Sequence, residues 1–105
     1  MNIKELNKIC MEMISYTGEG RSLVHEAIDL TLRGEYSKAR VTLDEGISLL
    51  NEGHRIQFED LMAKQMQGEE IPFSILLLHA MDLLMISTSE KDLIERVLSY
   101  KGENI

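Results

Sequence analysis

Hydrophobic residues recur at intervals of three and four along most of the chain, which is the spacing of one face of an α-helix. Three stretches show it: residues 3–33, 36–67 and 73–100. The turns between them fall at Gly34 and at residues 68–72, which contain the only proline. Glycine ends helices in a left-handed conformation, and proline is tolerated at a helix start. No stretch alternates polar and apolar residues as a strand does, so we expect an all-α fold.

Glycines interrupt the first two stretches. Gly18 and Gly20 divide the apolar stripe of residues 3–33, and each weakens a helix by roughly 1 kcal/mol relative to alanine, so we expect a kink or short break there. Gly46 and Gly53 lie seven residues apart in the second stretch. That spacing permits close approach of another helix, but simple tolerance of glycine explains it as well. The predicted buried side of the second stretch comprises Ala39, Leu43, Ile47, Leu50, Phe58, Leu61 and Met62.

Short turns between three long helices favour an antiparallel up-down-up bundle, and the length favours a single domain spanning residues 1–105. Residues 75–86 are unusual because ten of the twelve are apolar. A helix that is apolar almost all the way round must be covered on several faces. One face packs within the bundle, so we expect another to be covered by a second copy, in a homo-oligomer built around the third helix.

The formal net charge is −7 and no basic stripe is visible, which argues against binding to nucleic acid or to anionic membrane surfaces. Residues 71–86 are shorter than the roughly 20 residues of a membrane-spanning helix, and the N-terminus lacks a signal-peptide pattern. We therefore expect a cytoplasmic protein without direct membrane insertion. Cys10 is the only cysteine, lies in an apolar stripe, and is expected to be a small buried hydrophobic residue.

The two polar residues within 75–86 are His79 and Asp82, which are three residues apart and so lie on one side of a helix. Three interpretations are open. The pair could be structural, with Asp82 accepting a hydrogen bond from His79. Asp82 could bind a metal ion, because an oligomer axis brings identical carboxylates together and they cannot all ionise without a cation. His79 could be a nucleophile that accepts a phosphoryl group, provided that it lies at the edge of the apolar face.

Other candidate sites carry weaker signals. His25 and Glu26 lie on a helix whose hydrophobic pattern already explains them, and His54 lies on the second helix, three residues before Gln57. Surface or packing roles are expected for these residues ahead of catalysis. The glycines around residues 18–20 lack the spacing and the lysine of a phosphate-binding P-loop. The functional question therefore narrows to the third helix.

Residues 74–85 read S-I-L-L-L-H-A-M-D-L-L-M. They resemble the last helix of the lactose/cellobiose-type enzyme IIA of the bacterial sugar phosphotransferase system, which typically reads S-L-L-L-V-H-A-Q-D-H-L-M. Further segments resemble the family in the same order and spacing, from about residue 5 to residue 101. They are Gly20-Arg21-Ser22-Leu23 with Glu26-Ala27-Ile28, Gly34-Glu35-Tyr36 with Ala39, His54 with Gln57, and Gly68-Glu69.

The resemblance implies a homotrimer of three-helix subunits. It implies that His79 accepts a phosphoryl group from the phosphocarrier protein HPr and passes it to a cysteine of the cognate IIB component, which phosphorylates the sugar during transport through the IIC permease. The sugar would be a β-linked disaccharide of the lactose, cellobiose or chitobiose class. It also implies that Asp82 of three subunits meets on the trimer axis around a divalent cation, expected to be Mg²⁺. His54 and Gln57 are expected nearby as assisting residues.

The sequence departs from the family pattern at two positions. The histidine that usually follows the aspartate is replaced by Leu83, and the usual glutamine by Met81. Losing one preorganised donor to a developing charge costs on the order of 100-fold in rate. The alternatives are therefore a non-catalytic oligomeric interaction module built on the same scaffold, or a metal-dependent oligomerisation domain. Because His79 and Asp82 are both retained, we favour the phosphocarrier.

Overall fold

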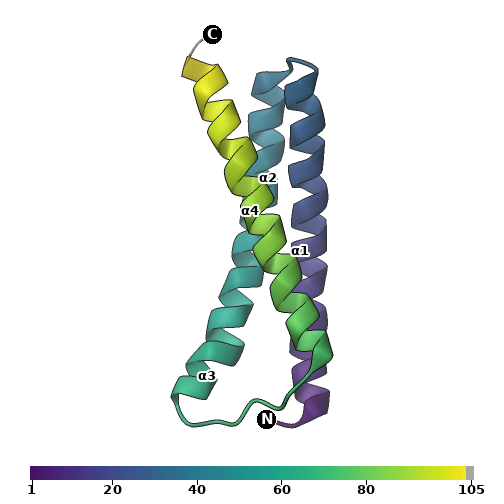
Figure 1. The fold of residues 1–105 in the computed structure, drawn as a ribbon, viewed down its shortest axis with the longest axis vertical. Coiled ribbons are helices and arrows are strands. Elements are labelled where there is room, and N and C mark those ends of the chain that lie inside the picture. The colour runs from purple at the N-terminus through teal and green to yellow at the C-terminus, as the bar shows by residue number, and fades with distance from the viewer. Residues whose placement is uncertain (104–105) are drawn as a thin grey trace.

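The computed structural model describes residues 1–103 and has three long helical segments that run alternately up, down and up (Figure 1). Its elements are α1 (Ile3–Leu32), α2 (Tyr36–Ile56), the π-helical η1 (Gln57–Met62), α3 (Ala63–Met66) and α4 (Ile75–Glu103). The second segment runs without interruption through α2, η1 and α3. The predicted all-α, up-down-up three-helix bundle is confirmed.

Local signals end α1 and begin α4. Gly34 has a φ of +79°, and the N–H of Glu35 donates to the carbonyl of Leu30 across this turn at 2.9 Å. This is the left-handed helix end predicted at Gly34. At the start of α4, the Ser74 hydroxyl accepts a hydrogen bond from the N–H of Leu77 at 3.2 Å. The third helix therefore begins at a serine cap, slightly later than the proline suggested.

Glycines allow α1 and α2 to pack closely. A Cβ atom on Gly20 would lie 3.1 Å from the Gly46 carbonyl oxygen, and one on Gly46 would lie 3.0 Å from the Gly20 carbonyl oxygen. A Cβ atom on Gly53 would lie 2.8 Å from Oγ1 of Thr17. The close approach considered for Gly46 and Gly53 is confirmed. The break expected at Gly18 and Gly20 is wrong: α1 continues through both residues, and at Gly20 the close contact with Gly46 and Leu50 of α2 offsets the intrinsic helix cost of glycine.

The core consists of two clusters of buried side chains. The cluster nearer the α1–α2 turn comprises Val24, Ala27, Leu30, Ala39, Leu43, Leu50, Ile94 and Leu98. The cluster nearer the N-terminus comprises Leu6, Cys10, Met13, Ile56, Leu61, Ala80 and Leu84. Cys10 is fully buried, as expected. α4 crosses the α1–α2 hairpin obliquely (Figure 1) and contributes one face to both clusters, so its other face is directed outward.

The sequence pattern does not predict η1. Hydrogen bonds in a π-helix join residues five apart, so this segment holds more residues per turn than the 3.6 repeat assumes. Phe58 and Met62 were expected on the buried side, but their side chains are 55% and 47% exposed, whereas Leu61 is buried. The expectation for Phe58 and Met62 is wrong because, at 100° per residue from Ala39, they lie about 100° and 140° away from the buried face, whereas Leu61 lies within about 40° of it.

Candidate functional site

The outward face of α4 carries apolar side chains along most of its length. They recur on one side of the helix and are each between 44% and 74% exposed: Ile75, Leu78, Met85, Ile86, Leu93, Val97 and Tyr100. We call this set the α4 stripe. None of the helices within residues 1–103 is long and apolar enough to cross a membrane. A contiguous apolar surface of this kind on a small bundle marks an interaction site.

His79 and Asp82 both lie exposed on the outward side of α4. Asp82 is four residues after Leu78 and three before Met85, which puts its carboxylate inside the α4 stripe. His79 projects about 60° away from Asp82 around the helix, so the imidazole lies at the edge of the stripe. No hydrogen bond or ion pair joins the two side chains in the described part of the chain. The structural pair considered from the sequence is therefore not formed in this subunit.

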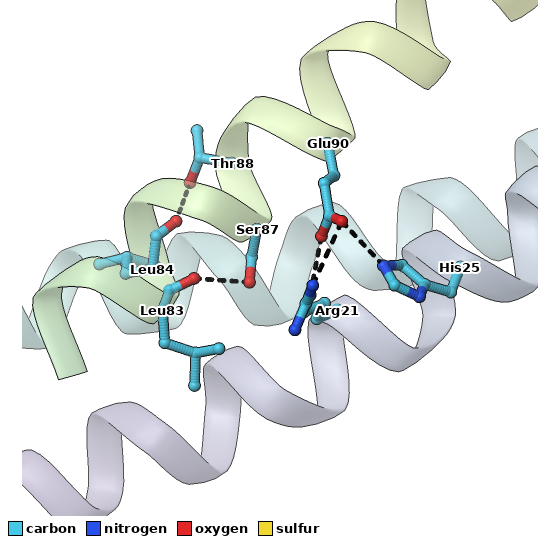
Figure 2. Close-up of polar contacts among 7 residues, drawn as sticks. All are labelled: Arg21, His25, Leu83, Leu84, Ser87, Thr88 and Glu90. Atoms are coloured by element: carbon cyan, nitrogen blue, oxygen red, sulfur yellow. Dashed lines mark hydrogen bonds and ion pairs between the residues drawn. The ribbon is translucent and has the colours of Figure 1, made fainter. Parts of the chain in front are cut away.

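His54 holds α2 against α4. Its Nε2 lies 2.9 Å from Oγ1 of Thr88, and the Thr88 hydroxyl donates its own proton to the carbonyl of Leu84 at 2.7 Å (Figure 2). The hydroxyl must therefore accept a hydrogen bond from His54, which places a proton on Nε2. Thr88 follows His79 by nine residues, or about 13 Å along the helix axis. The structure does not bring His54 to the His79 of the same subunit.

Gln57, the first residue of η1, lines a pocket of about 390 Å³ between η1 and the start of α4. The apolar side chains that line it include Leu61, Met62, Ile71, Leu77, Leu78 and Met81. Leu78 and Met81 bracket His79 along α4, but His79 itself does not line the pocket. Gln57 therefore lies beside the side of α4 that carries Leu77, Leu78 and Met81, and not beside the side that carries His79.

Apolar side chains occupy the two positions at which the sequence departs from the family pattern. Leu83 is half-buried, and its backbone carbonyl accepts a hydrogen bond from the Ser87 hydroxyl at 2.6 Å (Figure 2). Met81 is 36% exposed and lines the pocket. Neither side chain can donate a hydrogen bond to a phosphoryl oxygen.

A charged cluster further along α4 was missed by the sequence analysis. Arg21 donates from Nε to Oε1 of Glu90 at 2.7 Å, and His25 Nε2 lies 3.1 Å from Oε2 of Glu90 (Figure 2). The hydrogen bond from Arg21 lowers the pKa of Glu90, and the same bond raises the pKa of Arg21. The only signal in the sequence was the spacing of four between Arg21 and His25, because Glu90 lies 69 residues after Arg21.

One subunit does not supply a complete metal site. Within residues 1–103, no three His, Cys, Asp or Glu side chains are grouped so that they could hold an ion. Asp82 offers one exposed carboxylate, the type of hard oxygen ligand that Mg²⁺ prefers. The donor chemistry fits, but a cation at Asp82 requires carboxylates from further copies of the chain.

The sequence of this chain is similar to those of known proteins. The family model of the PTS system, Lactose/Cellobiose specific IIA subunit, matches residues 8–101. The PTS system lactose-specific EIIA component of Staphylococcus aureus (strain N315) is 33% identical over 100 residues, which cover 95% of this chain and 96% of the relative.

Two solved structures share the fold. The crystal structure of PtcA from S. mutans has a TM-score of 0.91 and 33% identity, and the match covers 95% of this chain and 97% of that one. The PTS cellobiose-specific enzyme IIA from Bacillus anthracis has a TM-score of 0.85 and 27% identity, with 98% and 92% covered. The chain therefore belongs to the lactose/cellobiose-specific IIA family and is a component of a sugar phosphotransferase system.

Proposed function

We propose that His79 accepts a phosphoryl group from HPr and passes it to a cysteine of a cognate IIB component. The sugar taken up would be a β-linked disaccharide of the lactose, cellobiose or chitobiose class. The observation that carries this proposal is the exposure of His79 at the edge of the α4 stripe. There a visiting protein can reach the imidazole while the stripe itself is covered by other subunits. Membership of the IIA family supports the same role.

The transfer needs a ring nitrogen of His79 that carries no proton. That nitrogen attacks the phosphorus carried by HPr, and the bond from phosphorus to the donor atom of HPr breaks with its electron pair remaining on HPr. In the second step, the thiolate of the IIB cysteine attacks the phosphorus. The phosphorus–nitrogen bond then breaks, and its electron pair returns to the imidazole. The phosphoryl group is conserved through both steps, and only protons are exchanged with solvent.

The proposal includes a homotrimer in which three α4 helices surround a threefold axis. The α4 stripe is the apolar surface that this assembly would bury, and Asp82 lies inside it. Three converging carboxylates repel one another unless a cation neutralises them. Mg²⁺ held by Asp82 of the three subunits would supply that positive charge. His79, at the edge of the stripe, would lie at the seam between subunits.

HPr and IIB would dock over this seam beside His79. The net charge of −7 suits a donor protein with a basic face and does not suit nucleic acid. These partners place the protein in the cytoplasm, and the IIC permease is reached only through IIB. Gln57 would assist at the phosphoryl group. His54 would assist indirectly, since its bond to Thr88 holds α2 against α4.

A non-catalytic oligomeric interaction module is the second candidate, and the apolar side chains of Leu83 and Met81 favour it. Such a module would keep the bundle, the α4 stripe and the docking surface without accepting a phosphoryl group. The two candidates therefore differ in one measurable property, the formation of phosphohistidine.

Incubation with phosphoenolpyruvate, enzyme I and HPr tests the proposal. We expect an acid-labile, base-stable phosphate on the wild-type protein and none on His79→Gln. The His25→Gln variant is the control and should keep the label, because His25 pairs with Glu90 away from the proposed site. An unlabelled wild-type trimer would favour the interaction module. A trimer that dissociates in chelator and never takes label would indicate a metal-dependent oligomerisation domain.

A further inference from the structure

We infer that the bundle consists of two units that open separately by local unfolding, and that the unit carrying His79 and Asp82 opens while the other stays folded. Each unit is built around one of the two core clusters. The pocket unit comprises residues 3–16, 54–66 and 75–86, and the turn unit comprises residues 18–50 and 89–100. The inference concerns one chain and requires neither the proposed phosphocarrier function nor the proposed trimer.

A buried layer of small and polar residues separates the two clusters, which share no residue. α1 contributes Thr17, α2 contributes Gly53 and α4 contributes Ser87, and all three are buried. A Cβ atom on Gly53 would lie 2.8 Å from Oγ1 of Thr17, so α1 and α2 touch here. α1 and α4 run in the same direction (Figure 1), and Arg21 contacts Glu90 about one turn beyond the layer. Thr17 and Ser87 therefore lie at the same level.

The buried hydroxyl groups of this layer do not tie the helices together. The Ser87 hydroxyl donates to the carbonyl of Leu83 within α4 at 2.6 Å (Figure 2), and the Thr88 hydroxyl donates to the carbonyl of Leu84 in the same helix. Oγ1 of Thr17 is buried and has no hydrogen-bond partner among residues 1–103. A buried hydroxyl without a partner is unfavourable. The interior of the layer therefore contributes little to holding the two units together.

The polar contacts between helices lie at the edge of the layer, where the side chains are partly exposed. Arg21 and His25 of α1 both contact the carboxylate of Glu90 (Figure 2), and all three residues belong to the turn unit. These contacts can persist when the pocket unit opens. The contact between His54 and Thr88 does span the boundary, but a single exposed contact of this kind is weak. The two units are therefore joined mainly by the continuous helix backbones.

Packing is looser in the pocket unit. It contains the π-helical η1 and the pocket of about 390 Å³ between η1 and α4. Residues 67–74, which connect its α3 to its part of α4, form no helix. The turn unit instead contains the contact in which a Cβ atom on Gly20 would lie 3.1 Å from the Gly46 carbonyl oxygen, and only a short turn joins α1 to α2. Segments with fewer buried contacts open at lower free energy, so the pocket unit opens first.

Native-state hydrogen exchange of the full chain, followed by mass spectrometry at increasing urea, tests the inference. Backbone amides of residues 56–62 and 76–86 should exchange through an opening that needs less urea than unfolding of the whole chain. Amides of residues 22–30 and 40–50 should exchange only through global unfolding. If both groups exchange with the same free energy and the same dependence on urea, the inference is wrong.

Two conservative variants test whether α4 is divided. Ile56 lies in the core of the pocket unit and Ile94 in the core of the turn unit, and both are buried. Each Ile→Val change should accelerate exchange by about 2- to 10-fold in the units that it affects. Ile56→Val should accelerate both units, because global unfolding includes the pocket unit. Ile94→Val should accelerate the turn unit alone; equal acceleration in both units would mean that the bundle opens as one.

A pair of threonine variants tests whether the polar layer is the boundary. Thr17→Val replaces the hydroxyl that lacks a partner with a methyl group, so exchange in the pocket unit should slow by about 5-fold or more. Thr31→Val is the control: Thr31 lies in the turn unit and its hydroxyl donates to the carbonyl of Ala27 at 2.7 Å. This control should not slow exchange in the pocket unit. A Thr17→Val protein whose pocket unit exchanges at the wild-type rate would contradict the assignment of the boundary.

Discussion

Glu90 is the acidic side chain whose ionisation is coupled to the packing of α1 on α4. Its pKa is lowered below the ordinary value of 4.5, mainly by the hydrogen bond from Arg21. A lowered pKa in the folded state means that the stabilisation is complete above the unfolded-state pKa and is lost as the pH falls through the folded-state value. Glu90 is 28% exposed and Arg21 37%, so the pair is partly screened.

We expect Glu90→Gln to lower the free energy of unfolding by about 0.5–1 kcal/mol at pH 7, which is the range for a well-aligned surface pair. The difference from wild type should shrink as the pH falls through the lowered pKa of Glu90, because the wild-type carboxylate then becomes protonated. Urea unfolding at pH 7 and at pH 3 measures both values. A difference that stays the same at the two pH values would show that Glu90 acts through packing and not through its charge.

Periodicity in the sequence predicts the position of a side chain only where that position depends on one helix alone. His79 at the edge of an apolar face, and Asp82 within that face, follow from spacings of three and four residues. The contacts of Arg21 with Glu90 and of His54 with Thr88 depend on how two helices are aligned along their lengths. Periodicity within a helix carries no information on that alignment, so these contacts were not predicted.

Replacing a helical glycine with alanine should have opposite effects on the stability of the bundle at Gly46 and at Gly18. A Cβ atom on Gly46 would lie 3.0 Å from the backbone oxygen of Gly20 and 3.3 Å from Cβ of Leu23, whereas one on Gly18 would have no neighbour within 4 Å. Gly46→Ala should therefore destabilise the bundle by about 1–2 kcal/mol, because α1 and α2 must move apart. Gly18→Ala should stabilise it by up to about 1 kcal/mol, through helix propensity.

Thermal unfolding followed by circular dichroism compares these two alanine variants with wild type. Opposite shifts of the melting temperature are expected. Shifts of the same sign would mean that helix propensity, and not the approach of α1 to α2, decides the effect of both substitutions.

The helices themselves were predictable because their apolar stripes keep a 3.6-residue period over many turns. The break expected at Gly18 and Gly20 was wrong because tertiary contacts at Gly20 outweigh local propensity. η1 could not be predicted from the same period, since the π-helical turn changes the register from Gln57 onwards. Gln57, Leu61 and Met62 line the pocket beside α4, and the pairing of this segment with the start of α4 depends on how two helices are aligned, which periodicity within one helix does not predict.

The proposed trimer would cover the outward face of the bundle with other copies of the chain. α4 contributes one face to the core and directs an apolar stripe outward. Among residues 1–103 of one subunit, His79 makes no side-chain hydrogen bond, and Asp82 is not grouped with further side chains that could hold a cation. In the proposed trimer, one threefold arrangement would both cover the α4 stripe and bring three Asp82 carboxylates together, so the proposed cation site depends on that assembly.

The cation site makes a prediction for the assembled protein that does not involve phosphoryl transfer. With Asp82 ionised in all three subunits, removal of Mg²⁺ by EDTA should lower the melting temperature and favour dissociation. Added Mg²⁺ should restore stability by about 1.4 kcal/mol for each tenfold excess over its dissociation constant.

Asp82→Asn removes the repelling charges, so the trimer of this variant should form without Mg²⁺ and should be unaffected by EDTA. Asp29→Asn, at an exposed aspartate of α1, should respond to EDTA as wild type does. Sedimentation velocity and thermal unfolding, each with and without EDTA, measure these responses; a wild-type trimer indifferent to EDTA would mean that Asp82 holds no cation.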